Sequence, residues 1–94
     1  MGRTFAVSII TPERSLFDGE ALYLSVPGGA GSMGILPDHA PLLSTLMPGR
    51  FELRIPSSEK AVFFKTQKAG FIEVKRNVVS ILLDAGDSAP ILIP

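Results

Sequence analysis

His39 is the only histidine in the 94 residues, and it directly follows the carboxylate of Asp38. An imidazole titrates near neutral pH, so it can act as a general acid or base when a carboxylate or nucleophile is suitably placed beside it. The side chains of neighbouring residues, however, diverge in an extended or turn conformation. The sequence also lacks the Gly-x-Ser-x-Gly elbow that presents a nucleophilic serine. We therefore interpret His39 as a turn or interface residue and not as a catalytic base.

A glycine-rich segment, residues 28–34, comes shortly before that histidine. Such segments can cradle a phosphate when the chain continues into the N-terminus of a helix. Here Ile35-Leu36-Pro37 follows, which is not a helix start. The segment instead predicts a wide loop in which glycines adopt positive φ and Met33 is exposed. A loop with so little charge and bulk suits close approach by another protein.

Metal ligands are scarce, because the sequence has no cysteine and its neighbouring carboxylates Asp18 and Glu20 lie on opposite sides of an expected turn. No calcium-loop spacing occurs, so we expect neither a metal nor a cofactor. Nine basic and nine acidic side chains balance, which argues against a nucleic-acid partner. No apolar run reaches the roughly 18 residues of a membrane helix, and the first residues do not predict a secretory signal. A soluble, intracellular domain is expected.

Short apolar alternations separated by turn residues make up most of the chain. Phe51, Leu53 and Ile55 alternate with charged residues, which is the clearest pattern of a half-buried strand. Proline and glycine turn signals separate these segments, and no window has sustained helical spacing. The pattern predicts an all-β domain of about eight to ten short strands, an antiparallel β-sandwich or flattened barrel with little or no helix.

Aromatic side chains are expected to supply much of the core, namely Phe5, Phe17, Phe51, Phe63 or Phe64, and Phe71. A tight turn at Asp18-Gly19 is expected to end a short strand at Leu16-Phe17. Residues 85–94 have no clear pattern, and the triplet Ile91-Leu92-Ile93 can either pair at a sheet edge or contact a partner.

The order and spacing of several motifs resemble the N-terminal β-sandwich domain of the epsilon subunit of F-type ATP synthases, which is called delta in mitochondria. The resemblance covers about 80 residues and is carried by Ile10-Thr11-Pro12-Glu13, Leu16-Phe17-Asp18-Gly19-Glu20, Val26-Pro27-Gly28, residues 34–43, Met47-Pro48-Gly49, Gly70-Phe71-Ile72-Glu73-Val74, Asn77-Val78-Val79 and Leu82-Leu83-Asp84. The segment Asp38-His39-Ala40-Pro41-Leu42-Leu43 is its most specific piece, with Asp38 in the usual place of a glycine.

This resemblance implies a ten-stranded antiparallel sandwich that is not an enzyme. It implies a rotor subunit of the central stalk, which links the gamma subunit to the c-ring and helps couple ion translocation to ATP synthesis or hydrolysis. Such a subunit is peripheral to the membrane, on the cytoplasmic face of a bacterial inner membrane or the equivalent organelle face. The domain is expected to span residues 1–86, with residues 87–94 as a short tail in place of the usual helical arm. No ATP binding is expected.

The resemblance also implies two contact regions. Residues matching the gamma contact are Thr11, His39, Leu42 and Ser44. Residues matching the c-ring contact are Gly28, Gly29, Ala30, Gly31, Ser32 and Met33. Relatives often carry an acidic residue at the position of Ser32, so docking on the ring through an ion pair is not expected here.

A generic β-sandwich module that binds a protein or a carbohydrate is the alternative. Carbohydrate sites usually display exposed aromatic side chains, whereas this chain has no tryptophan and one tyrosine, Tyr23. The composition therefore argues against a carbohydrate site, and the resemblance implies the rotor subunit.

Overall fold

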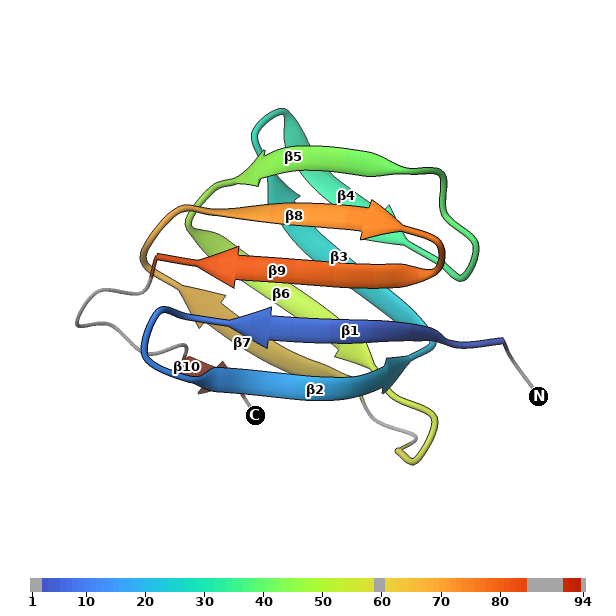
Figure 1. Cartoon of the computed structure of the whole chain (residues 1–94). Helices are drawn as coiled ribbons and strands as arrows, with labels where there is room; N and C mark the ends of the chain where they lie inside the picture. The colour runs from blue at the N-terminus through green and yellow to red at the C-terminus, as the bar shows by residue number, and fades with distance from the viewer. Residues whose placement is uncertain (1–2, 59–60, 85–90, 94) are drawn as a thin grey trace.

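The computed structural model describes residues 3–58, 61–84 and 91–93, and every regular element in this part of the chain is a strand (Figure 1). The strands form two layers. One layer contains β1 (Phe5–Ile10), β2 (Ser15–Ala21), β5 (Leu42–Leu46), β8 (Gly70–Lys75) and β9 (Val78–Leu83). The other contains β3 (Tyr23–Gly28), β4 (Gly31–Ile35), β6 (Gly49–Arg54), β7 (Val62–Thr66) and β10 (Ile91–Ile93). The expected all-β sandwich is therefore confirmed.

The two layers are one sheet that bends over itself. Its strand order is β10-β7-β6-β3-β5-β8-β9-β1-β2, and β4 pairs with β3 beside this path. The bend lies where Gly28 of β3 pairs with Leu46 of β5. Among the described strands, β2 and β10 end the order and do not pair with each other, so the flattened barrel is open along that edge.

The described strand pairs are antiparallel, with one exception: β1 and β9 run parallel to each other. The expectation of a purely antiparallel sandwich is therefore wrong at this pair. Tight turns make neighbours in sequence antiparallel, as in the β1–β2 and β8–β9 hairpins. Because β1 and β9 come from opposite ends of the sheet-forming sequence, no turn signal sets their relative direction, and closure of the sheet decides it.

Side chains from the inner faces of both layers form a single apolar core. Val79, Ile81 and Leu83 are buried, as the alternation in β9 predicts. On the inner side of one layer, the rings of the paired residues Phe51 in β6 and Phe64 in β7 stack with their centroids 4.6 Å apart. These contacts make the interior dense and stiff.

The phenylalanines divide between the core and the surface. Phe5 is buried, and Phe17 packs at the border of the core. Phe71, which was also expected in the core, is instead 54% exposed. Since Ile72 and Val74 point inward in the same strand, period-two alternation turns Phe71 outward.

β2 continues through Asp18 and Gly19, so the tight turn expected at these residues is wrong. They pair with Ser8 and Val7 of β1. A glycine is tolerated here because β2 lies at the edge of its layer. The ring of Phe17 covers it: a Cβ built on Gly19 would lie 3.2 Å from Phe17 Cζ.

The last described segment returns to the sheet as β10, antiparallel to β7, with Leu92 opposite Phe64. Edge pairing is therefore the role that the structure gives to this triplet. The domain boundary expected at residue 86 falls within residues 85–90, outside the described residues, and stays a prediction.

Candidate docking surfaces

The residues that the resemblance places at a gamma contact do not form one cluster. Thr11 follows β1. The pairing of β1 with β9, of β9 with β8 and of β8 with β5 aligns its neighbour Ile10 with the final residues of β5. Thr11 therefore lies at the end of the layer where β5 ends. His39 precedes the start of β5, at the opposite end of the same layer (Figure 1). The structure therefore brings together His39, Leu42 and Ser44, whereas Thr11 lies apart from them.

Thr11 is 7% exposed, and its hydroxyl is bound within the turn between β1 and β2. Oγ1 accepts hydrogen bonds from the backbone N–H groups of Glu13 and Arg14, at 3.3 and 3.2 Å. It also lies 3.3 Å from the carbonyl oxygen of Arg14, to which it can donate. A threonine bonded in this way stabilises a turn. A direct contact between Thr11 and a partner stays a prediction.

His39 is half-buried, and its Nδ1–H donates to the carbonyl of Ala40 at 2.7 Å. Its backbone N–H donates to the carbonyl of Leu36 at 3.2 Å. These two bonds fix the ring along the backbone of the turn before β5. The ring is thus held as part of a surface turn.

Leu42 and Ser44 lie on the inward side of β5, so they contribute less to the surface than expected. Leu42 packs against the border of the core, and Ser44 Oγ donates to the carbonyl of Thr45 at 3.1 Å. Leu43 points the other way and is 74% exposed. The exposed apolar side chain of this strand therefore lies one residue away from the predicted Leu42.

An exposed apolar patch lies on the outer side of β1, β5, β8 and β9, with Ser8, Glu73 and Ser80 among its side chains. Its four large side chains, with exposed fractions of 40 to 74%, are Ile10, Leu43, Phe71 and Leu82. Phe71 pairs with Leu82, and Leu82 is aligned with Ile10, so these three form a row across three strands. A shallow hollow of about 320 Å³ lies among them and includes Glu73. We call this patch the apolar face.

Sequence analysis missed the apolar face because Phe71 was assigned to the core. A signal for it exists in β9, which reads Val-Val-Ser-Ile-Leu-Leu. A strand with one solvated face normally alternates apolar and polar residues, whereas a near-continuous apolar run indicates cover on both faces. The outward side of β9, which includes Val78 and Leu82, stays partly exposed because no other segment of the described chain packs over it.

The glycine-rich segment is a tight hairpin and not the wide loop that was expected. Gly28 pairs with Gly31, so Gly29 and Ala30 alone make the turn. Gly31 adopts φ of 127°, a value that glycine reaches without a steric penalty. Residues 29–32 are exposed and uncharged. We call them the hairpin tip.

Met33 belongs to the core side of that hairpin, so its expected exposure is wrong. It pairs with Val26, whose side chain is buried, and it packs at the border of the core. A Cβ built on Gly28 would lie 3.0 Å from Met33 Cε. The two-residue turn fixes the register, and the register turns Met33 inward while Ser32 faces outward.

The outer side of the other layer is polar. The guanidinium carbon of Arg50 lies 4.3 Å from the centroid of the Phe63 ring. Next to it, Arg54 Nε donates to the carboxylate of Glu52 at 2.7 Å. Arg50 is thus paired with Phe63, and Arg54 with Glu52. We call these four side chains the polar face.

Reactive clusters are not seen among the described residues. In residues 3–58, 61–84 and 91–93, no three histidine, aspartate or glutamate side chains are grouped so that they could hold a metal ion. This part of the chain also contains no helix that is long and apolar enough to cross a membrane. The apolar face and the hairpin tip are therefore the candidate functional features.

Comparison with known proteins places the chain in a family. The family described as "ATP synthase, Delta/Epsilon chain, beta-sandwich domain" matches residues 4–88. An ATP synthase epsilon chain of Leptospira borgpetersenii is 50% identical over 80 residues, which are 85% of this chain and 61% of that protein. One of Dichelobacter nodosus is 39% identical over 84 residues, 89% of this chain and 57% of that protein. This chain thus spans about three fifths of the length of these relatives.

Solved structures share the fold. A chain of the Euglena gracilis mitochondrial ATP synthase (OSCP/F1/c-ring) has a TM-score of 0.81 at 18% identity, covering 95% of this chain and 53% of that one. A chain of the Tetrahymena thermophila mitochondrial ATP synthase (central stalk/c-ring) has a TM-score of 0.69 at 18% identity, covering 88% and 65%. The family match, the identity to the epsilon chains and the shared fold agree, and the chain belongs to the delta/epsilon chain β-sandwich domain family of ATP synthases.

Proposed function

We propose that this chain is the sandwich domain of a non-catalytic rotor subunit in the central stalk of an ATP synthase. It links a gamma subunit to the c-ring and helps couple ion translocation to ATP synthesis or hydrolysis. The names of its relatives and the assemblies that contain its structural neighbours support this role. The subunit is peripheral to the membrane, on the cytoplasmic face of a bacterial inner membrane or the equivalent organelle face.

The apolar face carries the proposal. Contiguous apolar patches are uncommon on monomeric proteins and mark interaction sites. The centres of stable interfaces are likewise apolar, with polar groups at the rim. We place the gamma subunit on this face, with Phe71, Leu82 and Leu43 as its main contacts. His39 lies at the β5 border of the contact, and Glu73 offers a single negative charge that a basic side chain of gamma can meet.

The hairpin tip is the proposed contact with the c-ring. It is small, exposed and uncharged, and the 51%-exposed side chain of Met47 follows the adjoining strand β5. The backbone N–H of Met47 donates to the carbonyl of Pro27 at 2.8 Å, which ties the residues after β5 to the hairpin. Ser32 can donate and accept hydrogen bonds, so the contact relies on shape and hydrogen bonding and not on an ion pair.

A mechanical role follows from the two contacts. Torque passes through a body when both partners are attached and the body does not deform. A close-packed interior has low compressibility, so the core between the layers meets the second condition. The apolar face and the hairpin tip, both built on strands, meet the first.

The decisive experiment measures affinity for the gamma subunit from the same source. Leu82→Glu puts a charge in the centre of the apolar face and is expected to weaken binding about 30-fold or more, as for an interface hot spot. Lys65→Glu, on the outer side of the other layer, is the control and should bind as the original chain does. A chain that fails to bind gamma where a known relative binds would overturn the proposal.

The ring contact needs a separate measurement on the assembled gamma complex. Ala30→Glu changes the exposed tip without touching the core, and it should reduce capture by the c-ring while leaving gamma binding unchanged. Loss of gamma binding instead would show that the two surfaces are assigned the wrong way round.

A further inference from the structure

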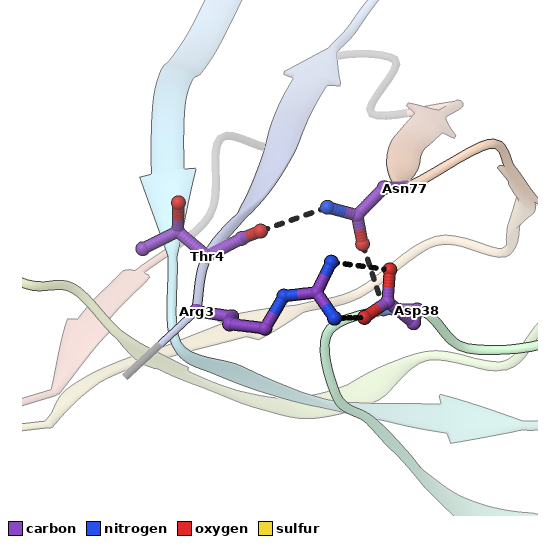
Figure 2. Close-up of polar contacts among 4 residues, drawn as sticks. All are labelled: Arg3, Thr4, Asp38 and Asn77. Carbon is purple, nitrogen blue, oxygen red and sulfur yellow. Dashed lines mark hydrogen bonds and ion pairs between the residues drawn. The ribbon is translucent and has the colours of Figure 1, made fainter. Parts of the chain in front are cut away.

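One side chain, that of Asn77, joins two segments that lie far from it in the sequence (Figure 2). Its Nδ2 donates to the carbonyl of Thr4 at 2.8 Å, just before β1. Its Oδ1 accepts from the backbone N–H of Asp38 at 2.7 Å, in the turn before β5. The backbone carbonyl of Asn77 also accepts from Ala6 N–H at 3.1 Å. Asn77 therefore connects the β8–β9 turn, the start of β1 and the turn that carries His39.

The backbone makes this connection possible. Arg76 and Asn77 have φ of 53° and 64°, and they form the two-residue turn between the paired residues Lys75 and Val78. Two-residue hairpins of this kind require positive φ, which asparagine tolerates well. Asp38 also has φ of 64°, which explains why a glycine suits its position in the family pattern.

A second, weaker link lies outside the first. Arg3 Nη2 donates to Asp38 Oδ1 at 3.1 Å, and Nη1 forms an ion pair with Oδ2. The two side chains are 74% and 49% exposed. Exposed pairs contribute little and are screened by salt. The amide of Asn77 bonds neutral backbone groups, so its link persists when salt is added.

We infer that Asn77 is a positioning residue for the docking surface: it holds the turn at residues 37–39, and hence His39, in place at the start of β5, the strand that carries Leu43 of the apolar face. Asn77 acts through this turn, and Arg3 with Asp38 adds a salt-sensitive supplement. The effect on a partner rests on the proposed function. The effect on the turn does not, so the two can be tested separately.

The first test reads the turn itself by amide hydrogen exchange. Asn77→Gly keeps the positive φ and removes both side-chain bonds. The reporter is His39 N–H, which bonds Leu36 and not Asn77. We expect its exchange to be about fivefold faster, because the hydrogen bond from Asp38 N–H to Asn77 Oδ1 no longer opposes opening of the turn. Arg76→Gly, at the neighbouring positive φ, is the control and should leave this exchange unchanged. Unaltered His39 exchange in Asn77→Gly would overturn the inference.

The second test measures gamma affinity of the same variants at low and high salt. Asn77→Gly should bind about five- to tenfold more weakly at both salt concentrations, whereas Asp38→Gly, which keeps its N–H for Asn77, should lose less than about threefold, and only at low salt. If the original chain does not bind gamma, the proposed function fails and the exchange result still decides the positioning role. If it binds and Asn77→Gly binds equally well, the positioning role in docking is wrong.

Discussion

The apolar face and the polar face are the two outer sides of one bent sheet, and their side chains differ in kind. On the polar face, Arg50 lies over Phe63 and Arg54 pairs with Glu52, so polar groups find partners within the chain. On the apolar face, the paired residues Phe71 and Leu82 remain 54% and 46% exposed within the described part of the chain. The side chains of the polar face find their partners in the isolated domain. The apolar face gains stability when another protein covers it.

This difference does not arise from the inward positions of the strands, which are alike in both layers. Inward positions in each layer carry large apolar residues, as Phe51 and Ile72 illustrate. The layers differ only in their outward positions. Residues at outward positions do not build the core, so their types depend on contact with partners or solvent and not on folding.

The largest expected effect separates the core from the apolar face. Phe51→Ala removes a buried, stacked ring and should lower the free energy of unfolding by about 3–5 kcal/mol. Phe71→Ala removes the same group from the surface and should cost less than about 1 kcal/mol. Urea unfolding of both variants measures this. Equal losses of unfolding free energy would mean that Phe71 stabilises the fold as much as Phe51 does. The apolar face would then be part of the folded core and not a surface for a partner.

The next effect compares the two faces directly through one substitution. Phe71→Ser should weaken gamma binding by about 2 kcal/mol, roughly 30-fold, because an interface anchor is lost. Phe63→Ser, on the polar face, should change it less than about threefold. Titration calorimetry of both variants provides the comparison. A larger loss for Phe63→Ser would place gamma on the polar face.

A smaller effect concerns the internal pairing of the polar face. Arg50→Ala removes the cation from the Phe63 ring and should destabilise the domain by about 0.5–1 kcal/mol. Gamma affinity should stay unchanged, since this contact is made within the chain. Thermal unfolding, together with binding measured under the same conditions, checks both statements. A gain in stability would show that the stacked arginine is not a favourable contact.

The smallest effect belongs to the Glu52–Arg54 pair, whose side chains are 23% and 58% exposed. Arg54→Gln should change the free energy of unfolding by no more than about 0.5 kcal/mol, and the change should shrink as salt is added. Unfolding at two salt concentrations tests this. A larger loss that salt does not affect would mean that Arg54 acts through packing.

The sequence by itself determined the strands and the core. Alternation at Phe51 and Leu53, and again at Val79, Ile81 and Leu83, specifies both a strand and its buried side, because a side chain every second residue faces the same way. Proline and glycine signals separated most strands correctly. The composition of residues 29–32 also determined that this segment is small and uncharged, although not that it forms a tight hairpin.

Tertiary structure decided what local patterns leave open. Alternation already puts Phe71 on the same side as Glu73, and Leu82 on the same side as Ser80, but only the bent sheet brings Phe71, Leu82 and Ile10 into one apolar row. The parallel pairing of β1 with β9 and the bonds of Asn77 to Thr4 and Asp38 likewise join residues distant in sequence. A sequence pattern reflects how residues close together along the chain are oriented relative to one another. The apolar face and its bordering turn arise from contacts between segments that no local pattern relates.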